Sequence, residues 1–308
     1  MQGPSTTPAA ATRADPVRAI AAFMRGFSLE ATRPTAREVA ALAEVLPGGT
    51  RVYVSAVPGR SAAESIAIAV RLKAVGLEPV PHLAVRNFAT LALIDDFLAR
   101  LTAEAGVRCV LVIAGDRDPP AGELRSALDV IDGALLHRRG IVEIGLAGYP
   151  DGHPRITEQE LDLALKKKID AAETLGLSIH IVTQFCFRPA AIVAWLAKLH
   201  EFGIEHPVRI GLAGPTSVAT LMRYASRCGV RALAQGLAHH AGLARELFAM
   251  WAPDGFVSAL AQARGSGALK PHFFSFGGLL PTARWAQAVA QGRVTLESGQ
   301  RFRVDPAG

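Results

Sequence analysis

The sequence predicts an α/β fold, a closed barrel of eight parallel strands ringed by helices, known as the TIM or (β/α)8 barrel. Short apolar or β-branched runs alternate regularly with longer stretches of helical periodicity. Eight such units fit within 308 residues, and a barrel of this kind usually takes about 250 residues. Half of the residues are apolar, which is enough for one large core. We therefore expect a single barrel domain over residues 1–308.

The expected strands are short runs bounded by turn residues. They are residues 27–30, 51–56, 79–83, 108–114, 142–148, 178–183, 208–213 and 271–276. Helical stretches lie between them, and each begins near a capping or helix-starting residue. They include residues 36–45, 61–75, 87–105, 157–175 and 189–202. A strand, a helix and a further strand in this order place the strands in parallel, joined by right-handed crossovers.

The two ends of the chain depart from this regular pattern. Residues 1–16, rich in Ala, Thr and Pro, predict a flexible amino-terminal segment. Residues 293–305 predict a terminal β-hairpin. Residues 216–265 are too long for one helix, and we expect two or three helices broken around glycines, namely Gly229, Gly236 and Gly242.

A doubly wound parallel sheet is the alternative fold, because it too alternates strands with helices. No Gly-x-Gly-x-x-Gly pattern follows an early strand, however, so the dinucleotide-binding form of that fold is not indicated. Gly-Leu-Ala-Gly occurs at residues 145–148 and again at 211–214. The flanking sequences do not match, so we interpret both copies as strand ends that turn through glycine rather than as a repeat.

Composition excludes several classes of protein. A charged fraction of 19% and a mean hydropathy of +0.26 exclude a disordered chain. No apolar run approaches the ~18 residues needed to cross a bilayer. Lys and Arg outnumber Asp and Glu by 33 to 27, but the excess is spread along the chain and aromatic residues make up only 6%. We expect small anionic ligands and no nucleic acid.

The cysteines and the amino-terminal residues indicate the compartment. Cys109, Cys186 and Cys228 are far apart in the sequence, which argues against a disulfide framework and a structural zinc site. No histidine pair has a carboxylate or cysteine at ligand spacing, so we expect no metal site. The first 17 residues lack the apolar segment of a secretory signal. The sequence therefore predicts a cytoplasmic protein.

Polar residues end six of the expected strands, and in a barrel of this kind the carboxyl end of each strand faces the active site. They are Glu30, Ser55, His82, Asp116, Tyr149 and Gln184. Each also has a structural interpretation. Glu30 could pair with a nearby arginine, Arg33 or Arg37, Asp116 and Tyr149 could shape turns, and His82 and Gln184 could satisfy core hydrogen bonds. Their convergence favours one shared site without identifying a reaction.

Seven short motifs follow one another at these strand ends. They are Phe-Ser-Leu-Glu at 27–30, Pro-His-Leu at 81–83, Ala-Gly-Asp at 114–116 with prolines at 119–120, Gly-Tyr-Pro-Asp-Gly-His-Pro at 148–154, Leu-Lys-Lys-Lys-Ile-Asp at 165–170, Val-Thr-Gln-Phe at 182–185 and, more weakly, His-Phe-Phe at 272–274. In this order they resemble the motifs of the methylenetetrahydrofolate reductase family, flavin-dependent TIM barrels that make methyltetrahydrofolate in one-carbon metabolism and methionine biosynthesis. The resemblance runs from about Phe27 to Ala213.

The resemblance implies a role for each of these residues. Glu30 would be the acid that assists opening of the folate imidazolidine ring, and Asp116 would stabilise the developing iminium cation. Gln184 would hydrogen-bond the pterin, and Phe187 would also contact the substrate. The residues lining the FAD would be Ser55, His82, Gly115, Asp116, Tyr149, His153, Lys167 and Lys168. The implied reaction is hydride transfer between NADH or NADPH and 5,10-methylenetetrahydrofolate through FAD.

The sequence also departs from the family's pattern. Ala31-Thr32-Arg33-Pro34 replaces an aromatic residue and two prolines, Ala114 replaces an arginine, Arg188 replaces an acid, and Leu161 and Ala164 replace polar residues. Loss of the arginine removes a cation that could balance a flavin diphosphate, although the two lysines could compensate. The sequence therefore does not exclude an alternative function, a reductase that passes hydride directly from the nicotinamide. Nor does it exclude a non-redox pterin-binding barrel, such as a methyltransferase component, or a noncatalytic folate-binding barrel.

Three further expectations follow from the resemblance. The chain ends soon after the barrel, so we expect the regulatory domain of larger relatives to be absent. Either direction of the reaction is compatible with the sequence. The sequence does not determine the oligomeric state, and a homo-oligomer is compatible with it.

Overall fold

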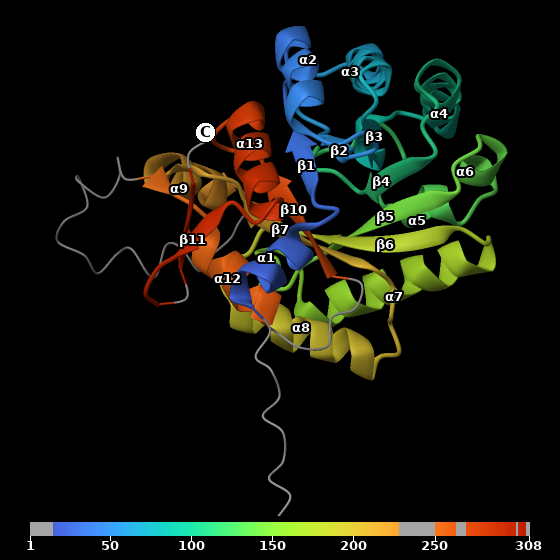
Figure 1. The fold of residues 1–308 in the computed structure, drawn as a ribbon. Helices are drawn as coiled ribbons and strands as arrows, with labels where there is room; N and C mark the ends of the chain where they lie inside the picture. Colours follow the sequence, from blue (N-terminus) through green and yellow to red (C-terminus); the bar gives the residue numbers. More distant parts are fainter. Residues whose placement is uncertain (1–14, 228–249, 263–268, 300, 306–308) are drawn as a thin grey trace, which may run out of the picture.

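The structure, a computed structural model, describes residues 15–227, 250–262, 269–299 and 301–305. Eight parallel strands close into a barrel in the order β1-β10-β7-β6-β5-β4-β3-β2, which confirms the predicted TIM barrel (Figure 1). Their bounds are β1 Ser28–Ala31, β2 Arg51–Val54, β3 Glu78–Ala84, β4 Cys109–Ile113, β5 Glu143–Gly148, β6 Ser178–Thr183, β7 Val208–Ala213 and β10 Leu269–Phe274. Each predicted strand is present, and two of them have the predicted bounds.

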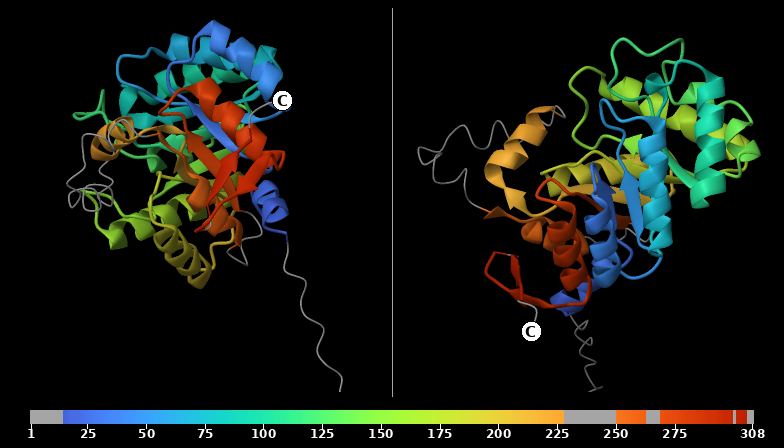
Figure 2. Two further views of the ribbon diagram at one scale, coloured as in Figure 1. Left: turned by 60° about the vertical axis from the view of Figure 1, so that its left-hand side comes forward. Right: turned by 90° about the horizontal axis from the view of Figure 1, so that it is seen from above.

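Helices surround the barrel, as the two views of Figure 2 show. They are α1 Pro16–Met24, α2 Ala36–Val45, α3 Ala62–Ala74, α4 Leu91–Ala105, α5 Leu128–Ile131, α6 Leu135–Arg138, α7 Glu158–Thr174, α8 Pro189–Glu201, α9 Val218–Arg227, α12 Asp254–Gln262 and α13 Leu279–Ala290, with the short 3-10 helix η1 Val85–Asn87. Among the residues with a described structure, no helix is long and apolar enough to cross a membrane.

Three of these helices begin with a capping box, which fixes the point where the chain leaves the loop above the barrel. The hydroxyls of Thr35, Ser61 and Thr157 each accept a hydrogen bond from the N–H of a glutamate three residues later. The glutamate carboxylate accepts one in return from the N–H of the capping residue. This reciprocal pair satisfies two amide groups that the first helical turn leaves free. The loops before α2, α3 and α7 are thereby anchored at their far ends, and the latter two carry the candidate site residues Ser55, Tyr149 and His153.

The chain outside the regular units only partly follows the prediction. The helix α1, which the sequence analysis did not predict, is capped by Asp15 and starts at Pro16. It packs against α12 and α13 and buries Ile20 and Met24. The terminal hairpin is confirmed by β11 Val294–Leu296 and β12 Phe302–Val304.

The segment after β7 holds one long helix on each side of a gap in the described chain. The strand β8 (Thr216–Ser217) leads into α9, and β9 (Met250–Trp251) leads into α12. The three glycines at which we expected helix breaks all lie in residues 228–249, outside the described residues.

The barrel interior contains both apolar and polar side chains. Tyr53, Val80, Cys109, Leu111 and Val182 form an apolar cluster that is separate from the larger core between strands and helices. Buried polar groups lie among them, namely Ser28, Glu30, His180 and His272. Because side chains of a strand alternate between its two faces, Ser28 and Glu30 project from β1 to the same side. The barrel therefore carries a polar core that reaches its carboxyl end.

Candidate active site at the carboxyl end of the barrel

Glu30 lies inside the barrel between two histidines from neighbouring strands. Its Oε2 accepts a hydrogen bond from Nε2 of His272 at 3.1 Å and lies 3.5 Å from Nε2 of His82. The Glu30 side chain is only 8% exposed. The predicted alternative, an ion pair with Arg33 or Arg37, is not formed among the described residues, where Glu30 pairs with His82 and His272. The Arg33 guanidinium donates instead to the carbonyl of Pro58. Glu30 and His82, two of the predicted site residues, are thus brought together.

A line of hydrogen bonds continues behind Glu30. The Ser28 hydroxyl lies 2.9 Å from Nδ1 of His272, and Nη1 of Arg209 donates to the same hydroxyl at 3.1 Å. With Glu30 ionised, His272 donates from Nε2, and its Nδ1 accepts the Ser28 hydroxyl hydrogen. From the sequence, His272 was expected only as part of a weak motif, and Ser28 had no predicted role. The available signal was the period of two on β1, which places Ser28 on the same face as Glu30.

The pKa shifts of this pair agree with those hydrogen bonds. Burial alone would raise the pKa of Glu30, but the neighbouring His82 and His272 lower it by more, and the net direction is downward. Burial lowers the pKa of His272, with Glu30 opposing that change. A carboxylate at Glu30 and a neutral imidazole at His272 are therefore the favoured forms in the free protein.

Asp116, Tyr149 and His153 lie together at the ends of β4 and β5. The rings of Tyr149 and His153 meet edge to face with centroids 5.5 Å apart. Burial raises the pKa of Tyr149, and the nearby charge of Asp116 raises it further. Burial lowers the pKa of His153, and Asp116 opposes this. Asp116 itself is exposed, so its carboxylate is free to face a ligand.

Glycines shape the two loops that carry these residues. Gly115 has a φ of +87°, and a Cβ placed there would lie 3.0 Å from Cβ of Ala84. In the other loop, the N–H of Gly152 donates to the carbonyl of Tyr149 at 2.9 Å, which confirms the predicted turn. Both positions have φ values that favour glycine.

Gln184 and Phe187 lie beside an aromatic wall. The N–H of Gln184 donates to the carbonyl of Gly148, and its side-chain Oε1 accepts from the N–H of Phe185 at 3.0 Å. The structural interpretation of Gln184, satisfying a backbone group, is therefore correct for its oxygen. The wall consists of Phe185, Phe187, Tyr224, Trp251, Phe274 and Phe276, whose ring centroids lie 4.2 to 5.8 Å from a neighbour. This cluster was not predicted from the sequence, because its members come from four separate segments.

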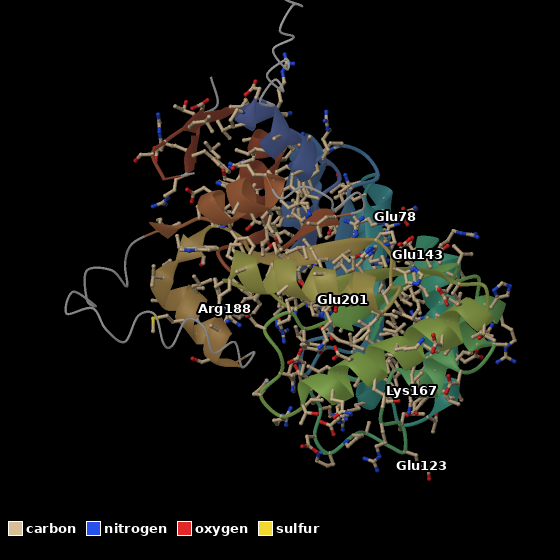
Figure 3. All side chains as sticks on the ribbon, turned by 90° about the horizontal axis from the view of Figure 1, so that it is seen from below. Glu78, Glu123, Glu143, Lys167, Arg188 and Glu201 are labelled. Carbon is tan, nitrogen blue, oxygen red and sulfur yellow. The ribbon has the colours of Figure 1, made fainter. Side chains whose placement is uncertain are left out.

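The remaining predicted flavin residues differ in their surroundings. Ser55 is buried at the end of β2, with its Oγ 3.4 Å from that of Thr32. Lys168 on α7 is half-buried, and burial lowers its pKa. Its neighbour Lys167, labelled in Figure 3, is exposed. The structure therefore separates two lysines that the sequence analysis treated alike.

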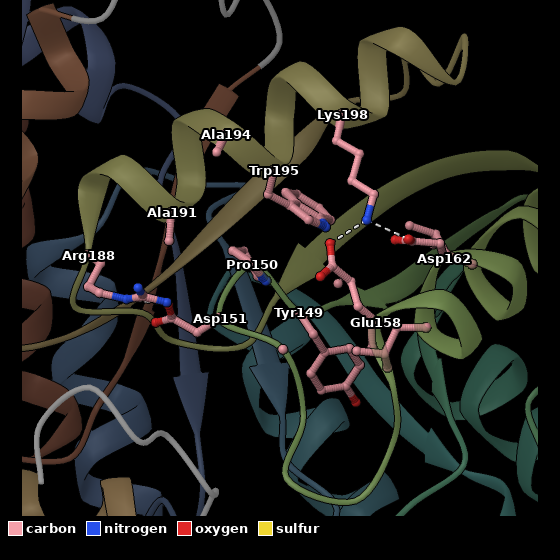
Figure 4. A pocket seen from close by; sticks show the side chains of 15 residues that line it. Tyr149, Pro150, Asp151, Glu158, Asp162, Arg188, Ala191, Ala194, Trp195 and Lys198 are labelled. Carbon is pink, nitrogen blue, oxygen red and sulfur yellow. Dashed lines mark hydrogen bonds and ion pairs between the residues drawn. The ribbon is translucent and has the colours of Figure 1, made fainter. Parts of the chain in front are cut away.

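A cavity of about 460 Å³ opens beside this site between α7 and α8 (Figure 4). Nζ of Lys198 lies 2.5 Å from carboxylate oxygens of both Glu158 and Asp162. Arg188, at the position where the family pattern has an acid, donates from Nε to Asp151 at 2.8 Å. This pair explains how the chain accommodates a cation there, because the loop after β5 supplies the balancing carboxylate.

The sequence matches a family model described as methylenetetrahydrofolate reductase over residues 30–239. Methylenetetrahydrofolate reductase 2 of Saccharomyces cerevisiae is 29% identical over 168 residues, covering 51% of this chain and 27% of that protein. The 5,10-methylenetetrahydrofolate reductase of Pectobacterium carotovorum is 28% identical over 158 residues, covering 51% of this chain and 50% of that protein. Methylenetetrahydrofolate reductase (NADH) 1 of Arabidopsis thaliana is 27% identical over 190 residues, covering 55% of this chain and 31% of that protein. The chain thus matches half or less of the length of these relatives.

Proposed function

The chain belongs to the methylenetetrahydrofolate reductase family, and from that premise we propose that it is an oxidoreductase that interconverts 5,10-methylenetetrahydrofolate and 5-methyltetrahydrofolate. The hydride would come from NADH or NADPH and reach the folate through FAD. One observation carries the proposal: a buried carboxylate, Glu30, stands between two imidazoles at the catalytic end of the barrel. A folate-binding barrel without chemistry would gain nothing from that arrangement, because an ionised buried carboxylate is costly to maintain.

Glu30 would act as the proton donor to the folate ring nitrogen. The free protein favours the ionised form, so the proton must be taken up as the substrate binds. A bound pterin would cover the 8% of the Glu30 side chain that is still exposed, and further desolvation raises the pKa of a carboxyl group. His272 would hold Oε2 in place through its Nε2, because the hydrogen bond from Ser28 fixes the imidazole tautomer. A general acid that is positioned in this way typically contributes about 10²- to 10⁴-fold in rate.

Asp116 would provide the electrostatic part of the mechanism. Opening of the folate ring creates a cationic iminium, and an exposed carboxylate near Tyr149 can face that charge. Gln184 would bind the pterin through its amide nitrogen, since its oxygen already accepts from Phe185. Phe187 and the aromatic wall would stack against a flat ring system, which is the shape of a pterin.

Two features of the described residues fit FAD. Lys168 is a half-buried cation with no carboxylate partner among the residues that the structure describes, and its position on α7 suits a diphosphate. His82 keeps Nε2 3.5 Å from Oε2 of Glu30, so its imidazole would hold that carboxylate beside the flavin ring. Ser55, Gly115, Tyr149 and His153 would complete the lining. FAD, when bound, supplies a ring that accepts hydride from the nicotinamide and passes it to the folate.

A flavin-free reductase of the same folate is the second candidate. The observation that favours it is the apolar character of Ala114, Leu161 and Ala164, where the family pattern has an arginine and polar residues. In that case Glu30 and Asp116 would keep their roles, and the nicotinamide would lie against the pterin directly.

An absorbance spectrum of freshly purified protein, followed by an anaerobic assay, tests the proposal. We expect the absorption of bound flavin and its bleaching by 5-methyltetrahydrofolate or by NADH. A colourless protein that gains no flavin from excess FAD, yet oxidises NADH in the presence of 5,10-methylenetetrahydrofolate, would establish the flavin-free reductase instead. A protein that binds the folate without any turnover, with or without FAD, would overturn the redox function and favour a pterin-binding barrel.

A further inference from the structure

A second pocket, of about 360 Å³, opens at the opposite end of the barrel from Glu30. It lies where the chain enters β1, β2 and β7, below the carboxyl end of α13. Three arginines line it, namely Arg25, Arg51 and Arg209, together with Gln287 and Gln291 from the end of α13. Among the residues that the structure describes, no acidic residue lines this pocket. Its wall therefore carries positive charge and amide groups, and of its three arginines Arg51 is paired with a carboxylate, that of Glu143.

Arg209 is the unusual member of this set. Its guanidinium donates to the carbonyl of Gly26 at 3.2 Å and to the Ser28 hydroxyl at 3.1 Å, both neutral acceptors. It has no carboxylate partner among the described residues, and burial lowers its pKa. The sequence of residues 263–268, which precedes the adjacent strand β10, contains no Asp or Glu either. The carboxylate of Glu143 acts on Arg209 without touching it, because both of its oxygens accept hydrogen bonds from Arg51. A ligand that brings a directly bound counter-charge to Arg209 would therefore stabilise the fold.

Arg51 differs, because it already has a partner inside the barrel. Its two terminal nitrogens donate to the two carboxylate oxygens of Glu143 at 2.7 and 2.6 Å. Glu143 also lies 2.8 Å from Nδ1 of His180, and Cys109 lies close by, so these three could in principle hold a metal ion. The paired guanidinium and the second arginine beside it make a cation unfavourable there. The excess of charge at this end favours an anion, bound on the outer side of Arg209.

We propose that this pocket is a binding site for a small oxyanion, specifically the phosphate group of a metabolite or free phosphate. The planar fork of Arg209 and the exposed Arg25 match the oxygens of a tetrahedral anion, and arginine is the residue best suited to such contacts. The amides of Gln287 and Gln291 can donate to further oxygens or to an attached group. The volume lies at the lower end of the range for small-molecule sites and accommodates more than a single ion. This inference does not depend on the proposed reductase activity.

An occupant of this pocket would contact the group that starts the hydrogen-bond line to Glu30. Arg209 donates to Ser28, Ser28 contacts His272, and His272 contacts Glu30. An anion on Arg209 would weaken the positive potential along this line. Binding of an anion would therefore change the electrostatic potential at the Glu30 carboxyl group without any movement of the backbone.

Titration calorimetry of the full chain, at constant ionic strength in chloride, tests the site. The probes are inorganic phosphate, adenosine monophosphate and citrate. We expect saturable binding of phosphate with one site per chain, and a thermal midpoint that rises with phosphate concentration. Tighter binding of adenosine monophosphate than of phosphate would identify a phosphate ester as the ligand, and equal binding would identify free phosphate. Citrate binding without phosphate binding would overturn the proposal.

Two variants distinguish specific binding of phosphate in this pocket from nonspecific attraction of an anion to a basic protein. Gln287→Glu places a competing carboxylate on the wall, and Arg25→Gln removes an exposed cation, so neither should unfold the barrel. Each should weaken phosphate binding by about tenfold or more, as expected for loss of a charged hydrogen bond. Arg100→Gln on the exposed face of α4 removes the same charge as Arg25→Gln and should change affinity by less than about twofold. Equal weakening by Arg25→Gln and Arg100→Gln would show nonspecific attraction and overturn the site.

Discussion

Ser28 and His272 are direct partners in the parallel register of β1 and β10, and their side chains meet inside the barrel at 2.9 Å. The same imidazole contacts Glu30 at 3.1 Å through its other nitrogen. The hydroxyl, the imidazole and the carboxylate therefore form a unit fixed by strand pairing rather than by flexible loops. The orientation of the proposed acid is set by the most rigid part of the fold.

Replacing Ser28 with Ala should change the hydrogen bonding of Glu30 without removing a group that contacts the ligand. Nδ1 of His272 would lose its hydrogen-bond donor, and the other tautomer would turn a lone pair toward the carboxylate. We expect the alkaline limb of the folate half-reaction to move up by about one pH unit, with a loss of about 1 to 3 kcal/mol in stability. Thr282→Ala removes another buried hydroxyl, which donates to the carbonyl of Gly278, and serves as the control. The same shift of the pH profile in both variants would mean that Ser28 acts only through stability.

Glu30→Gln should leave reduction of the flavin by the nicotinamide intact and slow the folate half-reaction by about 10²- to 10⁴-fold. The amide keeps the size of the side chain but cannot donate the required proton at the same pKa. Stopped-flow measurement of the two half-reactions separates them. Equal slowing of both would indicate a structural role for this residue.

Asp116→Asn separates charge from shape in the loop after β4. The amide should preserve the turn and the flavin content while slowing hydride transfer with the folate by about 10²- to 10³-fold. Loss of the negative charge should also make the flavin easier to reduce. The measurements are the rate of the folate step, the flavin absorbance and the reduction potential. A variant with native melting temperature, full flavin and unchanged folate kinetics would exclude the electrostatic role.

Lys168→Gln and Lys167→Gln remove the same charge from adjacent positions on α7. Because only Lys168 is half-buried, its replacement should weaken FAD binding by about tenfold or more. Lys167 is exposed and screened by solvent, so its replacement should change affinity by less than about twofold. Titration of the apoprotein with FAD compares the two. Equal weakening would place the diphosphate elsewhere.

The acid dependence of stability should reflect Glu143. Burial would raise the pKa of this carboxyl, but His180 and Arg51 lower it to about 2, well below its usual range. A depressed pKa stabilises the folded state above the unfolded value, and the contribution fades as pH falls from about 4.5 toward 2. This pH-dependent part corresponds to about 3 kcal/mol. Urea unfolding of the natural protein and of Glu143→Gln should therefore converge as the pH is lowered, and a constant difference across that window would contradict the assignment.

The regular units of the fold were predictable from the sequence because each carries a strong local signal. Apolar and β-branched runs fixed β6 and β7 at their observed bounds, and the capping residue Thr35 marked the start of α2. The strand β10 begins two residues earlier than expected, because Leu269 pairs with Val208 and extends the ladder through Lys270. The helix α1 was missed although Asp15 and Pro16 form a capping signal, since the Ala-rich and Pro-rich residues before it dominated the interpretation.

The candidate site was predictable only where one residue stood at a strand end. Glu30 and His82 met that condition, and their proximity follows from barrel closure. The contact between Ser28 and His272 depends on the register of strands 244 residues apart, which no local pattern encodes. The exposure that separates Lys168 from Lys167 depends on the angle at which α7 packs. The pocket lined by Arg25, Arg51 and Arg209 combines four separate stretches of chain that meet only after the barrel has closed.

In most barrels of this kind, the active site lies at the carboxyl end of the strands and the opposite end contributes to stability. The line of hydrogen bonds from Arg209 to Glu30 connects these two ends. Here a guanidinium at the lower end and the carboxylate at the upper end belong to one string of polar contacts. A substitution in the strands around Arg209 is therefore expected to change the surroundings of Glu30 as well as the stability of the barrel.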